Sequence, residues 1–321
     1  ADFEVANGRY RIARIYTGES WNPGLDAPLA APGVDVRVGD YLLAVNGEEL
    51  TAADNVYRLF EGTADRQTRI TVGSRPSLRD ARTVTVVPVE SESALRREAW
   101  VADNRRRVDE LSGGRLAYVW VPNTGRGGYD AFNRWYFAQQ DRQGAIIDER
   151  FNSGGSAADY IVEVLTRAPH GYFNNPVGER TPFTSPAAGI WGPKVMIINE
   201  MAGSGGDLMP YMFRYYGAGT LVGTRTWGGL VGTWDTPQLL DGGTMIAPRG
   251  GFFDLDGEWR VENEGVAPDL EVEVTPKDVA AGRDPQLEAA VAEALRLLAE
   301  SPVVLKPEPA PPIRARRPPG R

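Results

Sequence analysis

Between residues 115 and 300, short apolar runs alternate with longer amphipathic ones, and this alternation most limits the folds open to the chain. The short runs have the length of buried strands, whereas the longer runs have helical periodicity. Strands that alternate with helices build a mostly parallel sheet, so we expect an α/β domain over residues 115–300. The strand runs are RLAYVWV, GAIIDERF, KVMIINE and GTLVGTRT, and the helical runs are DAFNRWYFAQQ, AADYIVEVLTR and GDLMPYMFRYYG.

The rest of the chain is organised differently. Residues 1–90 hold the β-like runs RYRIARIY, GDYLLAVNG, QTRITVG and ARTVTVVPV, with Asn46-Gly47 as a hairpin turn and AADNVYRLFEG as a helix. Residues 91–114 are charged and helical, which predicts a connector. Residues 301–321 are rich in proline and weakly basic, which predicts a disordered tail. We therefore expect two domains joined by a helix.

Composition excludes several classes of function. The chain has no cysteine, so it has no thiol nucleophile, disulfide or cysteine metal site, and its single histidine, His170, excludes a histidine metal cage. We expect no metal and no cofactor. A net charge of −8 with scattered basic residues argues against nucleic acid as a partner. No run approaches the roughly 18 apolar residues that span a membrane, so no membrane partner is expected.

Two glycine-rich turns follow strand runs of the α/β region. The first is Asn152-Ser153-Gly154-Gly155, and the second, some 50 residues later, is Ala202-Gly203-Ser204-Gly205-Gly206. Adjacent glycines at a strand–helix junction aim backbone N–H groups at one point, which suits an oxyanion. Ser204 is then a candidate nucleophile, with the Gly205 N–H as an oxyanion donor. The plainer alternatives are an N-cap serine and an ordinary glycine loop.

The first region resembles a PDZ domain through APGVDVRVGDYLLAVNGEELTAADNVYRLFEG. PDZ domains add an extended peptide to a sheet edge, although a role as a spacer is equally compatible with this sequence. The Asn-x-Gly-Gly turn resembles that of the crotonase/Clp superfold and of carboxyl-terminal processing peptidases. Those peptidases pair serine with a lysine, but here Gly229 follows Thr226-Trp227-Gly228 where that lysine would stand. His170, in a loop-like stretch, is a weak candidate for the base.

Six ordered motifs sharpen the resemblance: VGDYLLAVNG, DERFNSGG, INEMAGSGGD, GTRTWGGLVG, WRVENEGVAPDLEVE and GRDPQLEAAVAEAL. Together they resemble the C-terminal part of tricorn proteases, which are large cytosolic serine peptidases that form hexamers. The resemblance implies a PDZ-like β domain followed by a crotonase-like α/β catalytic domain. In that family the base is a histidine upstream of the PDZ domain, so we expect this chain to be part of a longer enzyme.

Carried over residue by residue, the resemblance implies Ser204 as the nucleophile. The oxyanion donors are the amides of Gly205 and Gly154, with Gly155 as the alternative to Gly154. Glu262, in preference to Glu264, is the glutamate that completes the proton relay with the serine and the upstream histidine. The type tricorn has aspartate where this chain has Gly205.

The sequence therefore predicts a cytoplasmic serine endopeptidase core that cleaves oligopeptides through an acyl-enzyme and forms homo-oligomers, hexamers by resemblance. The alternative is a PDZ and crotonase-like module that binds peptides or partners without hydrolysis. The two interpretations differ in whether a base reaches Ser204.

Overall fold

The computed structural model describes residues 1–312 apart from 20–21, 176, 178–181 and 235. Of the tail predicted over residues 301–321, the part beyond residue 312 lies outside the described residues. The chain divides into two units, Ala1–Asp103 and Asn104–Arg321. The charged helix expected over residues 91–114 is α1, Ser93–Ser112, which runs across this division. Each unit is described by itself below.

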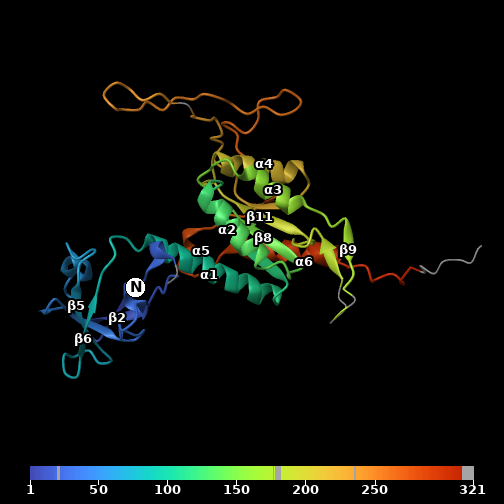
Figure 1. Ribbon diagram of the computed structural model, residues 1–321. Coiled ribbons are helices and arrows are strands. Elements are labelled where there is room, and N and C mark those ends of the chain that lie inside the picture. The colour runs from blue at the N-terminus through green and yellow to red at the C-terminus, as the bar shows by residue number, and fades with distance from the viewer. Residues whose placement is uncertain (20–21, 176, 178–181, 235, 313–321) are drawn as a thin grey trace, which may run out of the picture. The chain divides into compact units, whose positions relative to one another are not determined.

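Unit 1 is an antiparallel β domain. Its strands follow the order β1-β2-β3-β5-β6, with β4 paired to β3 (Figure 1). Apolar residues that alternate along these strands, such as Ile12, Leu42 and Ile70, form its core. The four strand runs predicted from the sequence are confirmed as β2, β3, β5 and β6. The bounds are β1 Asp2–Ala6, β2 Arg9–Arg14, β3 Tyr41–Val45, β4 Glu48–Glu49, β5 Thr68–Gly73 and β6 Arg82–Val86.

Local turn chemistry explains where unit 1 follows the predictions and where it departs from them. Asn46 and Gly47 have φ values of 50° and 88°, as a tight hairpin between β3 and β4 requires. The expected helix AADNVYRLFEG is only a 3₁₀-helix, η3, Val56–Phe60. It starts where Asn55 accepts a hydrogen bond from the Tyr57 N–H. Two further 3₁₀-helices are η1, Pro23–Leu25, and η2, Pro28–Ala30.

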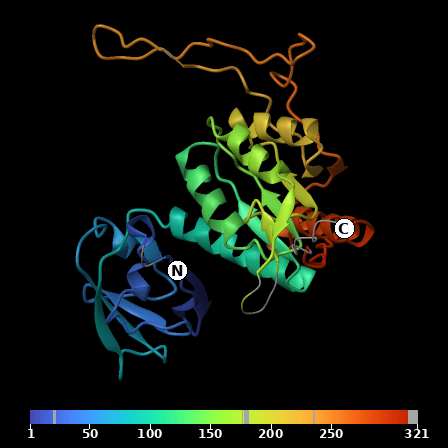
Figure 2. The same cartoon turned by 45° about the vertical axis from the view of Figure 1, so that its right-hand side comes forward.

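Unit 2 is built on a parallel sheet with the strand order β13-β12-β11-β8-β7, which confirms the expected α/β class. Figures 1 and 2 show α3 and α4 on one side of β8 and β11 and α6 on the other. The strands are β7 Leu116–Trp120, β8 Gly144–Asp148, β11 Lys194–Ile198, β12 Gly219–Gly223 and β13 Leu270–Glu271. The helices are α2 Arg126–Phe137, α3 Ala158–Thr166, α4 Gly205–Tyr215, α5 Pro276–Ala280 and α6 Pro285–Glu300.

The two faces of this sheet are covered differently. On one face, apolar residues of β7, β8 and β11 pack against α2, α3 and α4 in one core. On the other face, Tyr118 donates to Asp148, whose carboxylate is paired with Arg150. Arg150 also pairs with Asp284 next to α6, so charged groups that are buried here have partners. This packing fixes the carboxyl ends of the strands, where the glycine turns lie.

Two smaller features complete unit 2. Strands β9, Gly171–Phe173, and β10, Phe183–Ser185, form a two-stranded antiparallel sheet. A long arm, described over residues 232–234 and 236–260, extends for most of its length away from the helices that cover the sheet (Figures 1 and 2), while Phe252 packs against Tyr211 of α4. The arm exposes large apolar side chains, including Leu240 and Leu255. Among the helices in the described ranges, none is long and apolar enough to cross a membrane.

Candidate active site

Ser204 lies at a sharp turn between β11 and α4. Its backbone has φ 57° and ψ −117°, a left-handed conformation that costs energy for a residue with a side chain. An ordinary N-cap has an extended backbone, as Thr275 at the start of α5 does with φ −87° and ψ 157°. Ser204 departs from that geometry. Strained turns of this kind present the nucleophilic serine of α/β-hydrolases.

Two backbone N–H groups beside Ser204 have no acceptor in the described part of the chain. They belong to Gly205, the first residue of α4, and to Gly155. The two glycines lie close together, since a Cβ built on Gly205 would be 2.9 Å from the Gly155 nitrogen. The Gly154 N–H, by contrast, already donates to the side-chain oxygen of Asn152 at 2.9 Å.

Gly205 has no space for a side chain. A Cβ built there would lie 2.0 Å from the Thr124 Oγ1 and 2.4 Å from the Gly155 carbonyl oxygen. That Thr124 hydroxyl is fully buried and has no hydrogen-bond partner among the described residues. The start of α4 is therefore pressed directly against the loop that follows β8.

Two carboxylates hold the loop that follows β12. Asp207, fully buried on α4, accepts the N–H groups of Gly228 and Gly229 at 2.7 and 3.0 Å. Glu262 accepts those of Leu230 and Val231 at 2.6 and 2.7 Å. Four consecutive amides are thus bound by two side chains. We call residues 228–231 the clamped loop.

The backbone N–H of Ser204 joins the candidate nucleophile both to Asp207 and to the clamped loop. Asp207 accepts the Ser204 N–H at 2.8 Å, and the Gly229 carbonyl accepts the same N–H at 3.1 Å. Sequence reasoning missed this role of Asp207. The signal available was an acidic residue in the first turn of the helix after Ser204, which favours capping.

The backbone around Glu262 is strained. Val261 and Asn263 have φ values of 76° and 62°, and for a β-branched valine this is a true outlier. The Glu262 N–H donates to the Arg260 carbonyl at 2.9 Å, which closes a rare three-residue turn over Val261. Both amide bonds to Glu262 use its Oε2, and no described residue donates to Oε1. Glu264, the alternative from sequence, is exposed.

A second buried acid lies behind the site, and sequence reasoning missed it. Glu149 directly follows β8 and is fully buried. Burial, reinforced by the charges of Asp207 and Asp148, raises the pKa of Glu149 well above its ordinary value of 4.5. Its Oε2 lies 3.3 Å from the Asn152 amide nitrogen, and the Asn152 carbonyl accepts the Gly203 N–H. Glu149 therefore supports both glycine turns.

Neither candidate base from within the chain is brought to Ser204 by a described contact. His170 is exposed, and its Nδ1 lies 2.7 Å from the Ser185 carbonyl, next to the β9–β10 pair. At position 229, a Cβ would lie 2.4 Å from the Trp227 ring, so a lysine does not fit there without moving the indole. The glycine at this position has a local steric reason.

Comparison with known proteins agrees with this geometry. The family model described as the tricorn protease PDZ domain matches residues 1–91, and that of peptidase family S41 matches residues 115–272. A crystal structure of tricorn protease superposes with a TM-score of 0.84 at 34% identity, covering 93% of this chain and 29% of that one. The chain belongs to the tricorn protease family.

Curated tricorn relatives match nearly all of this chain. Tricorn protease homolog 1 of Streptomyces coelicolor is 40% identical over 94% of this chain and 28% of its own length. Tricorn protease of Thermoplasma acidophilum is 35% identical over 90% of this chain and 27% of its own. A putative tricorn-like protease C-terminal subunit of Sulfurisphaera tokodaii is 36% identical over 93% and 34%. The chain thus spans about a quarter to a third of these tricorn relatives.

Proposed function

We propose that this chain carries the nucleophile and oxyanion site of a serine endopeptidase that cleaves oligopeptides. The observation that carries the proposal is the strained Ser204 turn, held beside two unoccupied backbone amides. The proposed donors are Gly205 and Gly155. Gly155 replaces Gly154 in this role because the Gly154 N–H already donates to Asn152. Family membership supports the peptidase class.

In the proposed reaction, the Ser204 Oγ attacks the peptide carbonyl carbon while its proton passes to a base. The carbonyl oxygen becomes an oxyanion between the Gly155 and Gly205 amides. When the C–N bond breaks, the base returns the proton to the leaving amine, and water then hydrolyses the ester by the reverse roles. The proposal needs neither metal nor cofactor.

We propose that the base is a histidine from a segment upstream of residue 1, oriented through Glu262. Glu262 suits this role because two amides fix its Oε2 and leave Oε1 for another donor. A carboxylate held in this way orients an imidazole and stabilises its charged form. From the family resemblance we further propose hexameric assembly and a cytoplasmic location.

The test is hydrolysis of a fluorogenic peptide library by residues 1–321, with and without the upstream segment of the natural protein. We expect negligible activity without that segment and activity with it, which Ser204→Ala abolishes. Efficient hydrolysis by the chain alone that His170→Ala removes would assign the base to His170 instead. If the extended chain stays inert while folded, the binding-module alternative is favoured.

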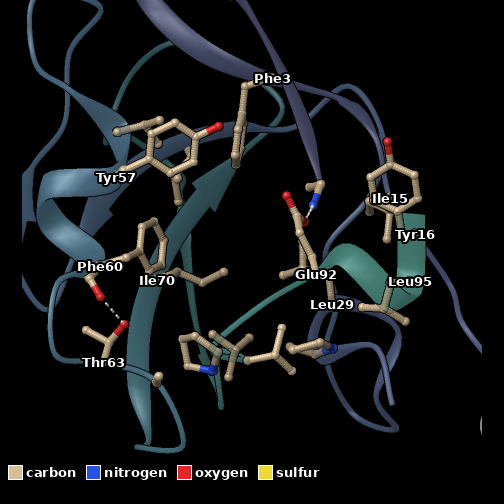
Figure 3. A pocket seen from close by; sticks show the side chains of 18 of the residues that line it. Phe3, Ile15, Tyr16, Leu29, Tyr57, Phe60, Thr63, Ile70, Glu92 and Leu95 are labelled. Atoms are coloured by element: carbon tan, nitrogen blue, oxygen red, sulfur yellow. Dashed lines mark hydrogen bonds and ion pairs between the residues drawn. The ribbon is translucent and has the colours of Figure 1, made fainter. Parts of the chain in front are cut away.

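A second candidate function, peptide binding by unit 1, is favoured by a separate observation. Unit 1 contains an apolar cavity of about 390 Å³ between η3, β2 and the segment before α1. Its size suits a small ligand or one or two side chains of a bound peptide. Figure 3 shows the side chains that border it, including Phe3, Ile15, Leu29, Phe60, Ile70 and Leu95, with Thr63 and Glu92 as polar members.

A further inference from the structure

Trp227 is an exposed aromatic residue held directly beside the candidate nucleophile. The residue is 70% exposed, which is unusual for so large an apolar side chain. Its backbone N–H donates to the Ala202 carbonyl at 2.9 Å, so it is fixed to the turn that carries Ser204. It is thus a rigidly attached surface residue rather than part of the core.

The indole ring lies against two glycines that bracket the Ser204 amide. A Cβ on Gly203 would lie 2.5 Å from the Trp227 Cε3, and a Cβ on Gly229 would lie 2.4 Å from its Cζ3. Gly203 precedes Ser204, and Gly229 accepts the Ser204 N–H. The ring therefore covers bare backbone on one side and is accessible on the other.

A second exposed apolar residue belongs to the turn to which Trp227 is hydrogen-bonded. Met201, one residue before the Ala202 that holds Trp227, is 62% exposed. Its N–H lies 3.3 Å from the side-chain oxygen of the buried Asn199, which also accepts the Phe151 N–H. Methionine sulfur and an indole face both bind aromatic and long aliphatic groups well.

We propose that Trp227, together with Met201, forms a specificity surface for an apolar side chain of the peptide next to the scissile bond. This inference rests on the proposed peptide substrate at Ser204. An aromatic or long aliphatic side chain would cover the exposed indole face, which buries apolar area on both partners. Peptides whose residues flanking the scissile bond are all small or charged would lack this contact.

The experiment measures binding, so that it needs no catalysis. Residues 1–321 with Ser204→Ala are irradiated with octapeptides that carry p-benzoylphenylalanine at successive positions, and adducts are located by mass spectrometry. The affinity of labelled peptides with one Phe or with Ala in its place is measured by fluorescence anisotropy. The variants are Trp227→Ala and, as a matched control, Trp259→Ala, because Trp259 is also 70% exposed but lies in the arm.

We expect adducts on Met201 or Trp227, and an affinity for the Phe peptide that falls about tenfold or more in Trp227→Ala. The Ala peptide should change less than about twofold, and Trp259→Ala should leave both unchanged. Adducts confined to other residues, or equal Phe-peptide affinity in Trp227→Ala and the parent, would overturn the proposal. Fluorophosphonate labelling is scored separately in the chain that keeps Ser204 and carries its upstream segment, so loss of the hydrolase role and loss of this surface are distinguishable.

Discussion

Gly205→Ala tests whether the start of α4 is pressed against the oxyanion loop as closely as the structure shows. An added Cβ would lie 2.0 Å from the Thr124 Oγ1 and 2.4 Å from the Gly155 carbonyl oxygen. Contacts this short force the helix and the loop apart.

Two opposing effects set the size of the change. Alanine in place of glycine at a helical position stabilises by about 0.5–1 kcal/mol when there is room. Overpacking of a tight contact destabilises by roughly 1–3 kcal/mol. Because the nearest atoms include the backbone of Gly155, which cannot rotate away, the steric effect should win, with a net loss of about 1–2 kcal/mol.

The assay is urea unfolding of residues 1–321, with Gly171→Ala as the control because a Cβ on Gly171 meets no atom within 4 Å. In the chain extended by its upstream segment, fluorophosphonate labelling of Ser204 should slow by about 10²-fold, the usual cost of one displaced oxyanion donor. A Gly205→Ala chain as stable as the parent, with an unchanged urea slope, would refute the close packing and with it this account of the glycine.

Three further predictions address other parts of the molecule. Thr124→Val removes a buried hydroxyl that has no partner among the described residues. The free energy of unfolding in urea should therefore stay the same or rise by up to about 1 kcal/mol, and a decrease would contradict the absence of a hydrogen bond to this hydroxyl. Burial lowers the pKa of Lys194 to about 8 from an ordinary 10.5, so the unfolded state binds more protons between these values and stability rises with pH there. Lys194→Met should abolish that rise and stabilise the chain at pH 7 by up to about 3 kcal/mol, as denaturation at several pH values will check. Peptides with a free carboxyl terminus should bind the chain, more weakly when amidated or when the cavity-lining Tyr57 is changed to Ala, and a terminal-peptide screen without any binder would contradict this.

Periodicity predicted most of the fold because a parallel sheet buried on both faces leaves long apolar runs in the sequence. The strand β1 was missed because an edge strand of five residues with exposed members carries little of that signal. The helix before Gly62 was overestimated, since only Val56 of η3 is buried and amphipathic packing contributes little to extending it.

The glycine turns were visible in the sequence, but the direction of each N–H was not. Gly154 and Gly155 are chemically identical in the sequence, and the structure distinguishes them because the Gly154 N–H donates to the Asn152 side-chain oxygen. The N–H groups that a carboxylate accepts are likewise set by tertiary structure, so the bonds from Asp207 and Glu262 to the clamped loop could not be found from spacing. Glu149 gave one weak signal, an acid at the end of an apolar strand run.

Gly229 and Trp227 relate the absence of a lysine at position 229 to the substrate contact proposed above. In serine–lysine peptidases of the resembled class, the position of Gly229 carries the base. Here the Trp227 ring occupies the space that a side chain at 229 would need. If the base comes from another segment and is oriented through Glu262, as proposed above, no proton-accepting side chain is needed at position 229. The glycine that leaves no room for a lysine also lets the Trp227 ring lie against the backbone, and the exposed face of that ring is the one proposed above to contact the peptide.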